Sequence, residues 1–504
     1  MMFTEKNKIK KSDLTFTNKC FIGIICSSVV IAIFYCFANG ISGNDYWWHI
    51  KLGEWVWKNK SVPTTDVFSW YGIENSLKIT VQQWLADVWF YGLQKTFGSI
   101  GVFLFSLFSA LGLIFLIIKS NVRKLLINAP FSALFLVLFA VLSTLFFYGR
   151  PQIFSFYFFY IILYCLFSFI NNPKSKAIYF VPLIGCLWSN FHGGSSNLSY
   201  LLCLAFLIIG FIKLDINKLY SERLSKQQLR TLALITGVTV LSVLINPIGF
   251  NVLIYPYVNM GDSFMLAVVS EWSSPDAKNI GDLILYFVPL LLVFFSFIIS
   301  KKRIKLLNLF LLLFFSFMFM RSIRFIIFFY IAVSFFAFDY MPRWSVKEIK
   351  GKFEKTIVML FFVVICAGVI HSIANVVPLV AEDKLISKAM SDDLVAVVRN
   401  ENPKRIFNDY NFGETLIYND IPVFFDSRAD LYAADNIMKN GVSLMYLQSQ
   451  EENKPFDVET MINNYKFDGI VVSVSRPLYA YLLSHEDKYQ LVYSDDIGGY
   501  FKVL

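Results

Sequence analysis

An aspartate and a histidine stand one helical turn apart in the stretch NDYWWHIKLGEWVWK, residues 44–58, directly after the first strongly apolar segment. If this stretch is a helix, Asp45 and His49 share one face, and three apolar residues line a neighbouring face. These three are Trp48, Leu52 and Trp55. A helix with this pattern is typical of a membrane surface, where tryptophans lie at headgroup depth. Asp45 would then hold a carboxylate beside the membrane, although the same residue could simply cap the helix.

Three further acids could assist such a carboxylate. A second amphipathic stretch, QQWLADVWFYGLQKTFG, carries Asp87, and the turn SVPTTD between the two stretches ends at Asp66. Glu271 belongs to a later segment, SEWSSPD. Asp87, Glu271 or, less readily, Asp66 could be a second acid, and the spacing does not choose among them. His49 could tune the carboxylate of Asp45 or make an ordinary hydrogen bond at the membrane surface.

Cationic side chains near the ends of apolar segments could bind a phosphate group. Arg321 and Arg324 are three residues apart, and a guanidinium can bind two phosphate oxygens at once. The alternative is that both side chains extend to lipid headgroups. Arg150 precedes Pro151, which fixes the start of the next helix, so it could face a ligand or bind lipid phosphate from a turn. His192 is followed by two glycines, which suits either backbone exposed to a ligand or a flexible helix junction.

The composition places the chain in a membrane. Of 504 residues, 56% are hydrophobic, 54 are phenylalanine and only 16% are charged, which is outside the range of soluble domains. About eleven apolar runs are candidate spans, and the run 177–190 is short enough to be a broken helix or one arm of a re-entrant hairpin. The runs are 21–38, 101–118, 131–148, 153–170, 177–190, 197–213, 231–246, 283–299, 304–320, 323–338 and 356–377.

The distribution of charge predicts the orientation. Lysines and arginines occur in every second loop between apolar runs, and such loops are retained on the cytoplasmic side. We therefore expect the N-terminus in the cytoplasm and the residues after Pro378 outside. The basic residues behind the formal charge of +9 lie in these short loops. Membrane topology explains them, and no nucleic-acid partner is required. The seven cysteines lie in or beside apolar segments and form no CxxC pair, so neither a disulfide framework nor a zinc site is indicated.

Three regions are expected along the chain. They are a basic cytoplasmic tail at 1–20, a membrane domain at 21–378 that includes the long first outer loop at 39–100, and an extracytoplasmic domain at 379–504. In the last region, predicted strands alternate with predicted helices, which indicates a small α/β domain with a largely parallel sheet. The predicted strands are KRIFNDY, IPVFFDS, FDGIVVSV, YQLVYSD and YFKVL. The expected fold is thus an α-helical polytopic membrane protein with a C-terminal extracytoplasmic α/β domain.

Charged residues that follow the predicted strands lie where open α/β sheets usually bind ligands. They are Asp409, Glu414, Asp426 and Arg428. Asp426 and Arg428 are two positions apart and would share one face of a strand. A structural ion pair between them is favoured over a sugar-binding site.

Glycosyl transfer at a membrane surface needs three kinds of side chain. A carboxylate deprotonates or orients the acceptor or holds a divalent metal, cations stabilise the departing lipid phosphate, and aromatic rings form a floor for the sugar. The residues named above could supply all three. No P-loop, GxSxG, HExxH or dinucleotide fingerprint occurs, which argues against ATP-driven transport and common hydrolase chemistry.

With these features, the chain resembles the membrane-embedded glycosyltransferases of the GT-C superfamily, which includes oligosaccharyltransferases and protein mannosyltransferases. The resemblance rests on one N-terminal span, a long outer loop with an early acid in GNDYWWHIKLGEW, two interfacial helices in that loop, many further spans and an extracytoplasmic C-terminal domain. The chain looks most similar to bacterial membrane proteins that carry a set of short segments along nearly the whole length. These are D-x-WWHI-x-x-G, VPTTDVFSW, QQWLADV, GRPQIFSF, WSNFHGG, INPIGF, SEWSSPD, NDYNFGETL and FFDSRADLY.

The resemblance implies that Asp45, the early acid of the first outer loop, is catalytic. Members of the superfamily often carry two adjacent acids there, but Asn44 precedes Asp45 in this chain. The second acid and any metal therefore stay open, with Asp45 as the ligand if a divalent cation such as Mg²⁺ or Mn²⁺ is bound. The WWDYG motif of oligosaccharyltransferase soluble domains has only a weak counterpart in NDYNFG, so recognition of an acceptor sequon is not implied.

The expected activity is inverting transfer of a sugar from a polyprenyl-phosphate-linked donor to a surface glycan or glycoprotein acceptor, at the outer face of a bacterial plasma membrane. Asp45 would act as the base, and Arg150, Arg321 or Arg324 would neutralise the lipid phosphate. One alternative is a non-catalytic membrane component of glycan assembly or export. Another is a transporter, which is disfavoured because the central spans carry few ionisable residues that could relay ions.

Overall fold

The computed structural model describes residues 16–38, 40–41, 43, 45–127, 129–147, 149–259, 270–341, 352–382, 384–432, 436–448 and 456–504. Contacts divide the chain into two compact units. The helical unit comprises Met1–Gly40 and Val102–Leu385, and the α/β unit comprises Ile41–Gly101 and Ile386–Leu504. Residues 41–101, which the sequence assigned to the membrane domain, therefore group with the C-terminal residues.

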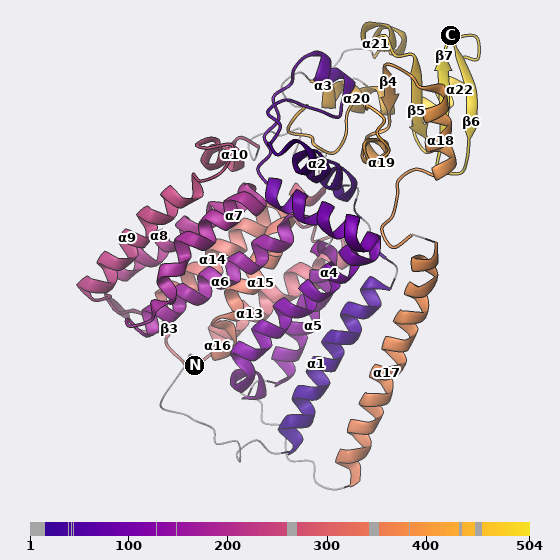
Figure 1. Cartoon of the computed structure of the whole chain (residues 1–504). Coiled ribbons are helices and arrows are strands. Elements are labelled where there is room, and N and C mark those ends of the chain that lie inside the picture. Colours follow the sequence, from indigo (N-terminus) through magenta and orange to yellow (C-terminus); the bar gives the residue numbers. More distant parts are fainter. Residues whose placement is uncertain are drawn as a thin grey trace. The chain divides into compact units, whose positions relative to one another are not determined.

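The helical unit consists of apolar helices joined mostly by short connections (Figure 1). Within a bilayer the backbone must satisfy its own hydrogen bonds, and an α-helix does so without a partner segment. The helices are α1 (Phe16–Phe37), the second part of α4 (Trp84–Ile127), α5 (Ala129–Phe146), α6 (Gln152–Asn171), α7 (Val181–Ser196), α8 (Leu198–Phe211), α9 (Lys226–Val243), α10 (Asn251–Asn259), α12 (Ile280–Asp282), α13 (Val288–Ile299), α14 (Leu306–Arg321), α15 (Ile326–Ser334), α16 (Ala337–Tyr340) and α17 (Lys352–Ala381). The helix α1 packs against α5 and α17, and α7 packs against α6 and α9.

Short 3-10 and π segments and a small sheet complete the helical unit. The short segments are η2 (Lys176–Phe180), η3 (Ser270–Trp272), η4 (Leu283–Phe287) and η5 (Ile323–Phe325). The sheet pairs β1 (Leu214–Ile216) with β2 (Leu219–Ser221) as an antiparallel hairpin, and β3 (Ile304–Lys305) joins β2 in parallel. These strands lie in two loops between apolar helices. Both loops carry lysine and arginine, and the sequence predicts them to be cytoplasmic.

The number of membrane spans is not confirmed. By length and composition, three helices of the described residues could cross a membrane: Trp84–Val122, Gln152–Asn171 and Ile280–Ile299. The pair Lys176–Ser196 and Leu198–Phe211 bends by 88° at its break and could form a fourth crossing, in agreement with the broken helix or hairpin predicted there. Over their described residues the other apolar helices do not pass the same test of length and composition, so the expected eleven spans stay a prediction.

The α/β unit contains a four-stranded sheet in the order β4-β5-β7-β6. Its strands are β4 (Ile406–Asn408), β5 (Gly469–Ser473), β6 (Tyr489–Ser494) and β7 (Gly498–Val503). The strands β4 and β5 are parallel, whereas β7 is antiparallel to both β5 and β6. The predicted largely parallel sheet is therefore wrong. Only residues 495–497 separate β6 from β7, and so short a connection can join only antiparallel strands.

Helices from both parts of the chain complete the α/β unit. They are α2 (Asp45–Asn59), α3 (Trp70–Glu74), the first part of α4, α18 (Asp392–Glu401), α19 (Gly413–Tyr418), α20 (Ile437–Tyr446), α21 (Val458–Tyr465) and α22 (Pro477–Leu483). A short 3-10 turn, η6 (Tyr410–Phe412), precedes α19. The backbone of α4 is non-helical at Gly98, with φ at 63°, a left-handed conformation that glycine adopts without steric cost. Both amphipathic stretches predicted in the first loop are thus helices, and the second one ends at this kink.

Residues 421–427, predicted as a strand, form only one isolated bridge, between Val423 and Ser69. The side chain of Asn408 bonds the backbone of this segment, as a partner strand would. Its Oδ1 accepts a hydrogen bond from the Phe424 backbone at 2.8 Å, and its Nδ2 donates to the Phe425 carbonyl at 2.8 Å. Because side-chain bonds of this kind compete with a ladder, the segment follows an irregular path.

The tryptophan of the first loop's VFSW segment lies in the aromatic core of the C-terminal residues. The ring of Trp70 stacks on Phe424 with centroids 5.6 Å apart and meets Phe467 edge-on at 6.1 Å. Its indole nitrogen donates to the Ile406 carbonyl at 2.9 Å. A buried indole needs such a partner for its N–H group. The loop and the C-terminal residues therefore share one hydrophobic core.

Candidate functional site

The helix α2, which begins at Asp45, is held between two other helices of the α/β unit. On one side, Gly53 lies against the backbone of Asp87 on α4, where an added Cβ atom would overlap the Asp87 carbonyl group. On the other side, Trp47 packs on Tyr418 of α19 with ring centroids 4.6 Å apart. Contacts on two sides fix the axis of α2. The position of Asp45, in the first turn, is therefore set by rigid elements of the unit.

Two of the three residues in the apolar stripe predicted to face lipid headgroups lie inside the α/β unit. Trp48 and Leu52 are buried, whereas Trp55 is half-buried. The prediction of headgroup depth is therefore wrong for Trp48 and Leu52, because both pack into the core of their own unit. The tryptophans exposed on the same two helices are Trp57 on α2 and Trp89 on α4. Neither belongs to the face singled out from the sequence.

His49 pairs with Asp87 and not with Asp45. Its Nδ1 lies 2.6 Å from Asp87 Oδ1, and both side chains are buried. The second carboxylate oxygen of Asp87 makes no hydrogen bond with any described residue. Because the histidine engages the acid, Asp87 is first of all one half of a buried pair that joins α2 to α4. Its role as a second acid beside Asp45 stays a prediction.

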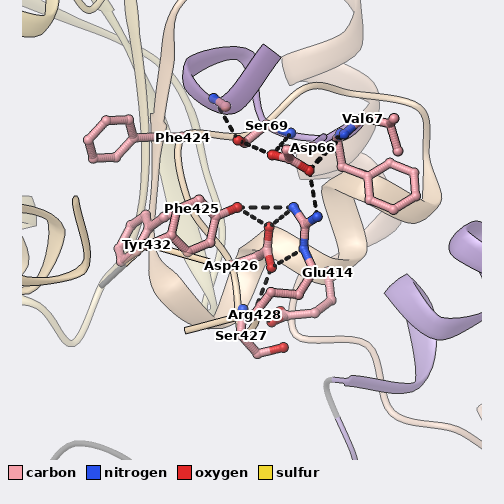
Figure 2. Close-up of polar contacts among 12 residues, drawn as sticks. Asp66, Val67, Ser69, Glu414, Phe424, Phe425, Asp426, Ser427, Arg428 and Tyr432 are labelled. Atoms are coloured by element: carbon pink, nitrogen blue, oxygen red, sulfur yellow. Dashed lines mark hydrogen bonds and ion pairs between the residues drawn. The ribbon is translucent and has the colours of Figure 1, made fainter. Parts of the chain in front are cut away.

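A buried arginine joins the first loop to the C-terminal residues (Figure 2). Arg428 donates from Nε and Nη2 to the two oxygens of Asp426 at 2.8 and 2.6 Å, and from Nη1 to Asp66 Oδ1 at 2.6 Å. The Tyr432 hydroxyl donates to Asp426 Oδ2 at 2.5 Å. The Ser69 hydroxyl and the backbone N–H groups of residues 67–69 donate to Asp66. The ion pair favoured from the sequence is present, and Asp66 is its unpredicted third member.

The charge of this network is set by its partners. Burial raises the pKa of Asp66, but the Arg428 guanidinium and the hydrogen bonds from Ser69 and the Phe68 backbone more than offset this and hold it below its ordinary value. Burial alone would lower the pKa of Arg428, yet the carboxylates of Asp426 and Asp66 raise it well above its usual range. The network therefore consists of two carboxylates around one guanidinium, all buried.

Glu414 is a buried acid on α19 without a cationic partner among the described residues. Its Oε1 accepts a hydrogen bond from the Ser427 backbone at 2.7 Å, and its Oε2 makes none with any described residue. Burial raises its pKa to about 8, with smaller contributions from the negative charges of Asp426 and Asp45. The side chain is therefore mainly a neutral carboxylic acid at neutral pH.

Asp409, another residue predicted at a ligand-binding edge, is occupied by structural contacts. Its carboxylate accepts hydrogen bonds from Arg476 Nε at 2.7 Å and from the Asn411 backbone at 3.1 Å. Arg476 also lies over the ring of Tyr446, with 5.0 Å between the guanidinium carbon and the ring centroid. These contacts tie the start of η6 to the segment before α22. The ligand-binding role considered for Asp409 stays a prediction.

Three of the charged residues predicted in the outer loops meet within the helical unit. Arg150 forms an ion pair with Glu271, and Arg324 lies over the ring of Trp272, 5.4 Å from its centroid. The Ser322 hydroxyl donates to the Glu271 carbonyl at 3.0 Å, which joins η3 to η5. Glu271 is thereby a partner for Arg150, and its role as a second acid stays a prediction. Arg321 is exposed at the end of α14.

His192 lies in a buried polar cluster of the helical unit. Its Nδ1 is 2.7 Å from the Ser155 hydroxyl and 2.9 Å from that of Ser195, and Trp188 donates to Ser155 at 2.8 Å. The backbone at His192 departs from helical values, with φ at −162° and ψ at 79°. Of the two interpretations, the helix junction agrees with this geometry. His192 and Gly193 are buried and Gly194 is half-buried, and the other interpretation, backbone exposed to a ligand, stays a prediction.

Among the described residues, no three histidine, cysteine, aspartate or glutamate side chains gather as a metal site. The divalent cation considered from the sequence stays a prediction, and we derive no step through a metal.

The sequence signals that would have identified the central contacts were weak. Asp66 and Arg428 are 362 positions apart, and no local pattern relates them. Each lies in a short segment, VPTTDVFSW and FFDSRADLY, that was recognised as characteristic but not as one of a contacting pair. Glu414 was noted only as a residue near a strand end. Its proximity to Asp45 follows from the packing of α2 on α19, which no sequence pattern reveals.

Comparison with known proteins gives a limited result. No family model matches the sequence, and no curated protein matches it. Among solved structures, the chain is similar to ArnT from Cupriavidus metallidurans, determined bound to undecaprenyl phosphate. The two share 12% sequence identity with a TM-score of 0.49, over 95% of this chain and 97% of that one. A likeness at this level assigns neither an activity nor site residues, so we argue the function from the chain's own side chains.

Proposed function

We propose that the protein is a membrane glycosyltransferase that transfers a sugar from a polyprenyl-phosphate-linked donor to a surface glycan or glycoprotein acceptor, at the outer face of a plasma membrane. The observation that carries the proposal is the placement of Asp45. It stands in the first turn of a helix that is fixed on two sides, by Gly53 against α4 and by Trp47 against α19. A base must be held in one geometry to accept a proton efficiently.

In the proposed reaction, Asp45 takes the proton of an acceptor hydroxyl. The acceptor oxygen attacks the anomeric carbon from the face opposite the lipid phosphate. The bond between that carbon and the phosphate oxygen breaks, and its electron pair leaves with the lipid phosphate, so the configuration at the anomeric carbon is inverted. Arg321 and Arg324 are the candidate cations for the departing phosphate. Arg150 is a weaker candidate because Glu271 already neutralises it.

The competing proposal is a non-catalytic component of glycan assembly or export. It is favoured by the ion pairs that several candidate acids form. Each of these acids bonds a cationic or imidazole side chain, and they are Asp66, Asp87, Asp409 and Asp426. A scaffold would need such pairs and would not need Asp45.

The test compares cells that lack the protein and are complemented with the wild type or with Asp45→Asn at equal membrane abundance. Mass spectrometry of surface glycans and of lipid-linked sugars is the readout. We expect Asp45→Asn to remove one glycan species and to cause one polyprenyl-phosphate sugar to accumulate. Glu54→Gln is the matched control, because it removes an acid from the same helix whose partners are the lysines Lys51 and Lys58. A glycan profile unchanged by Asp45→Asn would exclude the catalytic proposal.

A further inference from the structure

Glu414 is the buried acid that the proposed reaction does not yet use. The charged groups that face it are Asp426, from the segment after α19, and Asp45, from α2, and both are negative. The only nearby cation in the network, Arg428, is divided between Asp426 and Asp66. Burial next to two negative charges makes a third negative charge costly, so the neutral form of Glu414 is favoured.

The hydrogen of this neutral acid has a defined place. Glu414 Oε1 accepts the hydrogen bond from the Ser427 backbone N–H, so the carboxylic hydrogen belongs on Oε2. Oε2 is buried and makes no hydrogen bond with any described residue. A buried O–H group without an acceptor destabilises the folded protein. We therefore expect the Oε2 hydrogen to find an acceptor. Either a bound substrate or a small rotation of a neighbouring side chain could supply it.

The packing of α2 on α19 brings Asp45 to this place. Trp47 contacts Tyr418, and Lys51 Nζ lies 2.7 Å from Asp420 Oδ1, so later residues of α2 meet later residues of the α19 segment. Glu414 lies one helical turn before Tyr418, and Asp45 lies two residues before Trp47. The two acids accordingly lie at the same end of the helix pair.

We propose that Glu414 is a positioning residue for the proposed glycosyl transfer, a neutral carboxylic acid whose Oε2 hydrogen reaches the Asp45 carboxylate after a small rotation of the Asp45 side chain and then holds that carboxylate in the orientation needed to accept a proton. The inference rests on the proposed function. Glu414 keeps its proton throughout the reaction, and Asp45 alone takes the proton of the acceptor hydroxyl.

Two substitutions separate this role from simple packing. Glu414→Gln keeps both functions, since the amide oxygen can accept from Ser427 and the amide nitrogen can donate to Asp45. Glu414→Met has a similar volume but cannot donate. In right-side-out membrane vesicles that contain the native donor and acceptor, we expect Glu414→Gln to retain transfer and Glu414→Met to lose roughly 10–100-fold. Equal losses in both variants, with thermal unfolding midpoints near that of the wild type, would overturn the proposal.

The pH profile gives a readout that packing does not affect. Transfer by the wild type should decline as the pH of the vesicle medium rises through about 8, where Glu414 ionises. The Glu414→Gln variant should lack this decline, because its amide does not titrate. The proposal fails if both profiles decline together.

Infrared spectroscopy of the purified full-length protein keeps this inference distinct from the proposed function. The wild type at neutral pH should show the carbonyl band of a protonated carboxylic acid, and Glu414→Gln should lack it. If Asp45→Asn leaves the glycans unchanged but the band is assigned to Glu414, the proposed function fails while the protonated acid stands. If Asp45→Asn abolishes transfer but Glu414→Gln leaves the band in place, the proposed function stands and the role of Glu414 is excluded.

Discussion

At the scale of single residues, the clearest feature is an arginine that serves two parts of the chain. Arg428 binds Asp426 beside it and Asp66 from the first loop, and all three side chains are buried. Two carboxylates around one guanidinium depend on that cation, because an unpaired buried charge is costly. Arg428 is therefore a buried charged link between the loop and the C-terminal residues.

Replacing this arginine should be far more costly than replacing an arginine at the surface. Arg428→Met leaves two buried carboxylates without a cation, and we expect the free energy of unfolding to fall by about 3–5 kcal/mol. Arg405→Met is the matched control, because Arg405 joins the same two segments through Glu74 at 2.9 Å but is partly exposed. The expected loss there is about 0–1 kcal/mol. Thermal unfolding of the full-length protein in detergent measures both, and equal losses would contradict the role given to Arg428.

Glu414 should give stability a pH dependence of unusual sign. Its pKa is raised in the folded protein to about 8 from an ordinary 4.5, so the folded state holds a proton that the unfolded chain releases between these values. Its contribution to stability is complete below pH 4.5 and is lost as the pH rises to about 8. The wild type should therefore lose stability relative to Glu414→Gln across this window. Parallel curves of unfolding midpoint against pH for the two proteins would contradict the raised pKa.

Residue-level predictions from the sequence succeeded where the partners are close along the chain. Asp426 and Arg428, two positions apart, form the predicted ion pair. The partners of His49, Arg150 and Asp66 could not be predicted, because each lies on a different element and only the packing brings them together. The sequence therefore identified most of the charged residues that matter but not how they are combined.

At the scale of elements, the helix α2 depends on a close approach to α4. Gly53 allows it, since any side chain there would meet the backbone of Asp87. The same approach brings His49 within 2.6 Å of Asp87. A displacement of α2 would therefore move both the buried pair and the first turn that carries Asp45.

A single methyl group should test this approach. Gly53→Ala must push α2 away from α4, and we expect overpacking to cost about 1–3 kcal/mol and to reduce glycosyl transfer. Gly92→Ala is the control on α4, because nothing lies within 4 Å of the position its Cβ atom would take. In a helix this change should be neutral or slightly stabilising. Unfolding midpoints and vesicle transfer rates of the two variants test this expectation. If the Gly53→Ala protein is as stable and active as Gly92→Ala, α2 does not need the close contact with α4.

Most individual elements could be predicted from periodicity and turn residues. The stretch expected as a helix at 44–58 is α2, and the stretch at 82–98 is the part of α4 before the kink at Gly98. The sheet could not be predicted correctly, because alternating strands and helices suggest parallel pairing while the order of strands in space is not encoded in that alternation. Residues 421–427 have strand-like composition, but side-chain bonds from Asn408 replace the ladder.

At the scale of the whole molecule, the first loop and the C-terminal residues form one compact unit although more than half of the chain separates them. Trp70 lies in the core of the C-terminal residues, and Asp66 bonds Arg428. The sequence marked the change in composition near Ala381 but assigned the loop to the membrane domain, since a loop is ordinarily grouped with the spans on either side of it. Long-range pairing of this kind leaves no local signal.

Removing the C-terminal residues should therefore unfold the loop. In a chain that lacks residues 386–504, Trp70 and Asp66 lose their partners, and a cysteine at buried Ser69 should become reactive to a membrane-impermeant maleimide. In the full chain, Ser69→Cys should react slowly. The control is Ser61→Cys, which is exposed and should react in both chains. Protection of Ser69→Cys in the shortened chain would show that the loop folds alone.

The most direct test of the proposed glycosyl transfer is the release of free polyprenyl phosphate by the purified full-length protein in lipid nanodiscs that contain a lipid and glycan extract of the host membrane. The proposal predicts that the wild type releases it, and that Asp45→Asn does so about 100-fold more slowly or worse, the contribution expected of a general base. Release at equal rates by the two proteins, or no release by either, would contradict it.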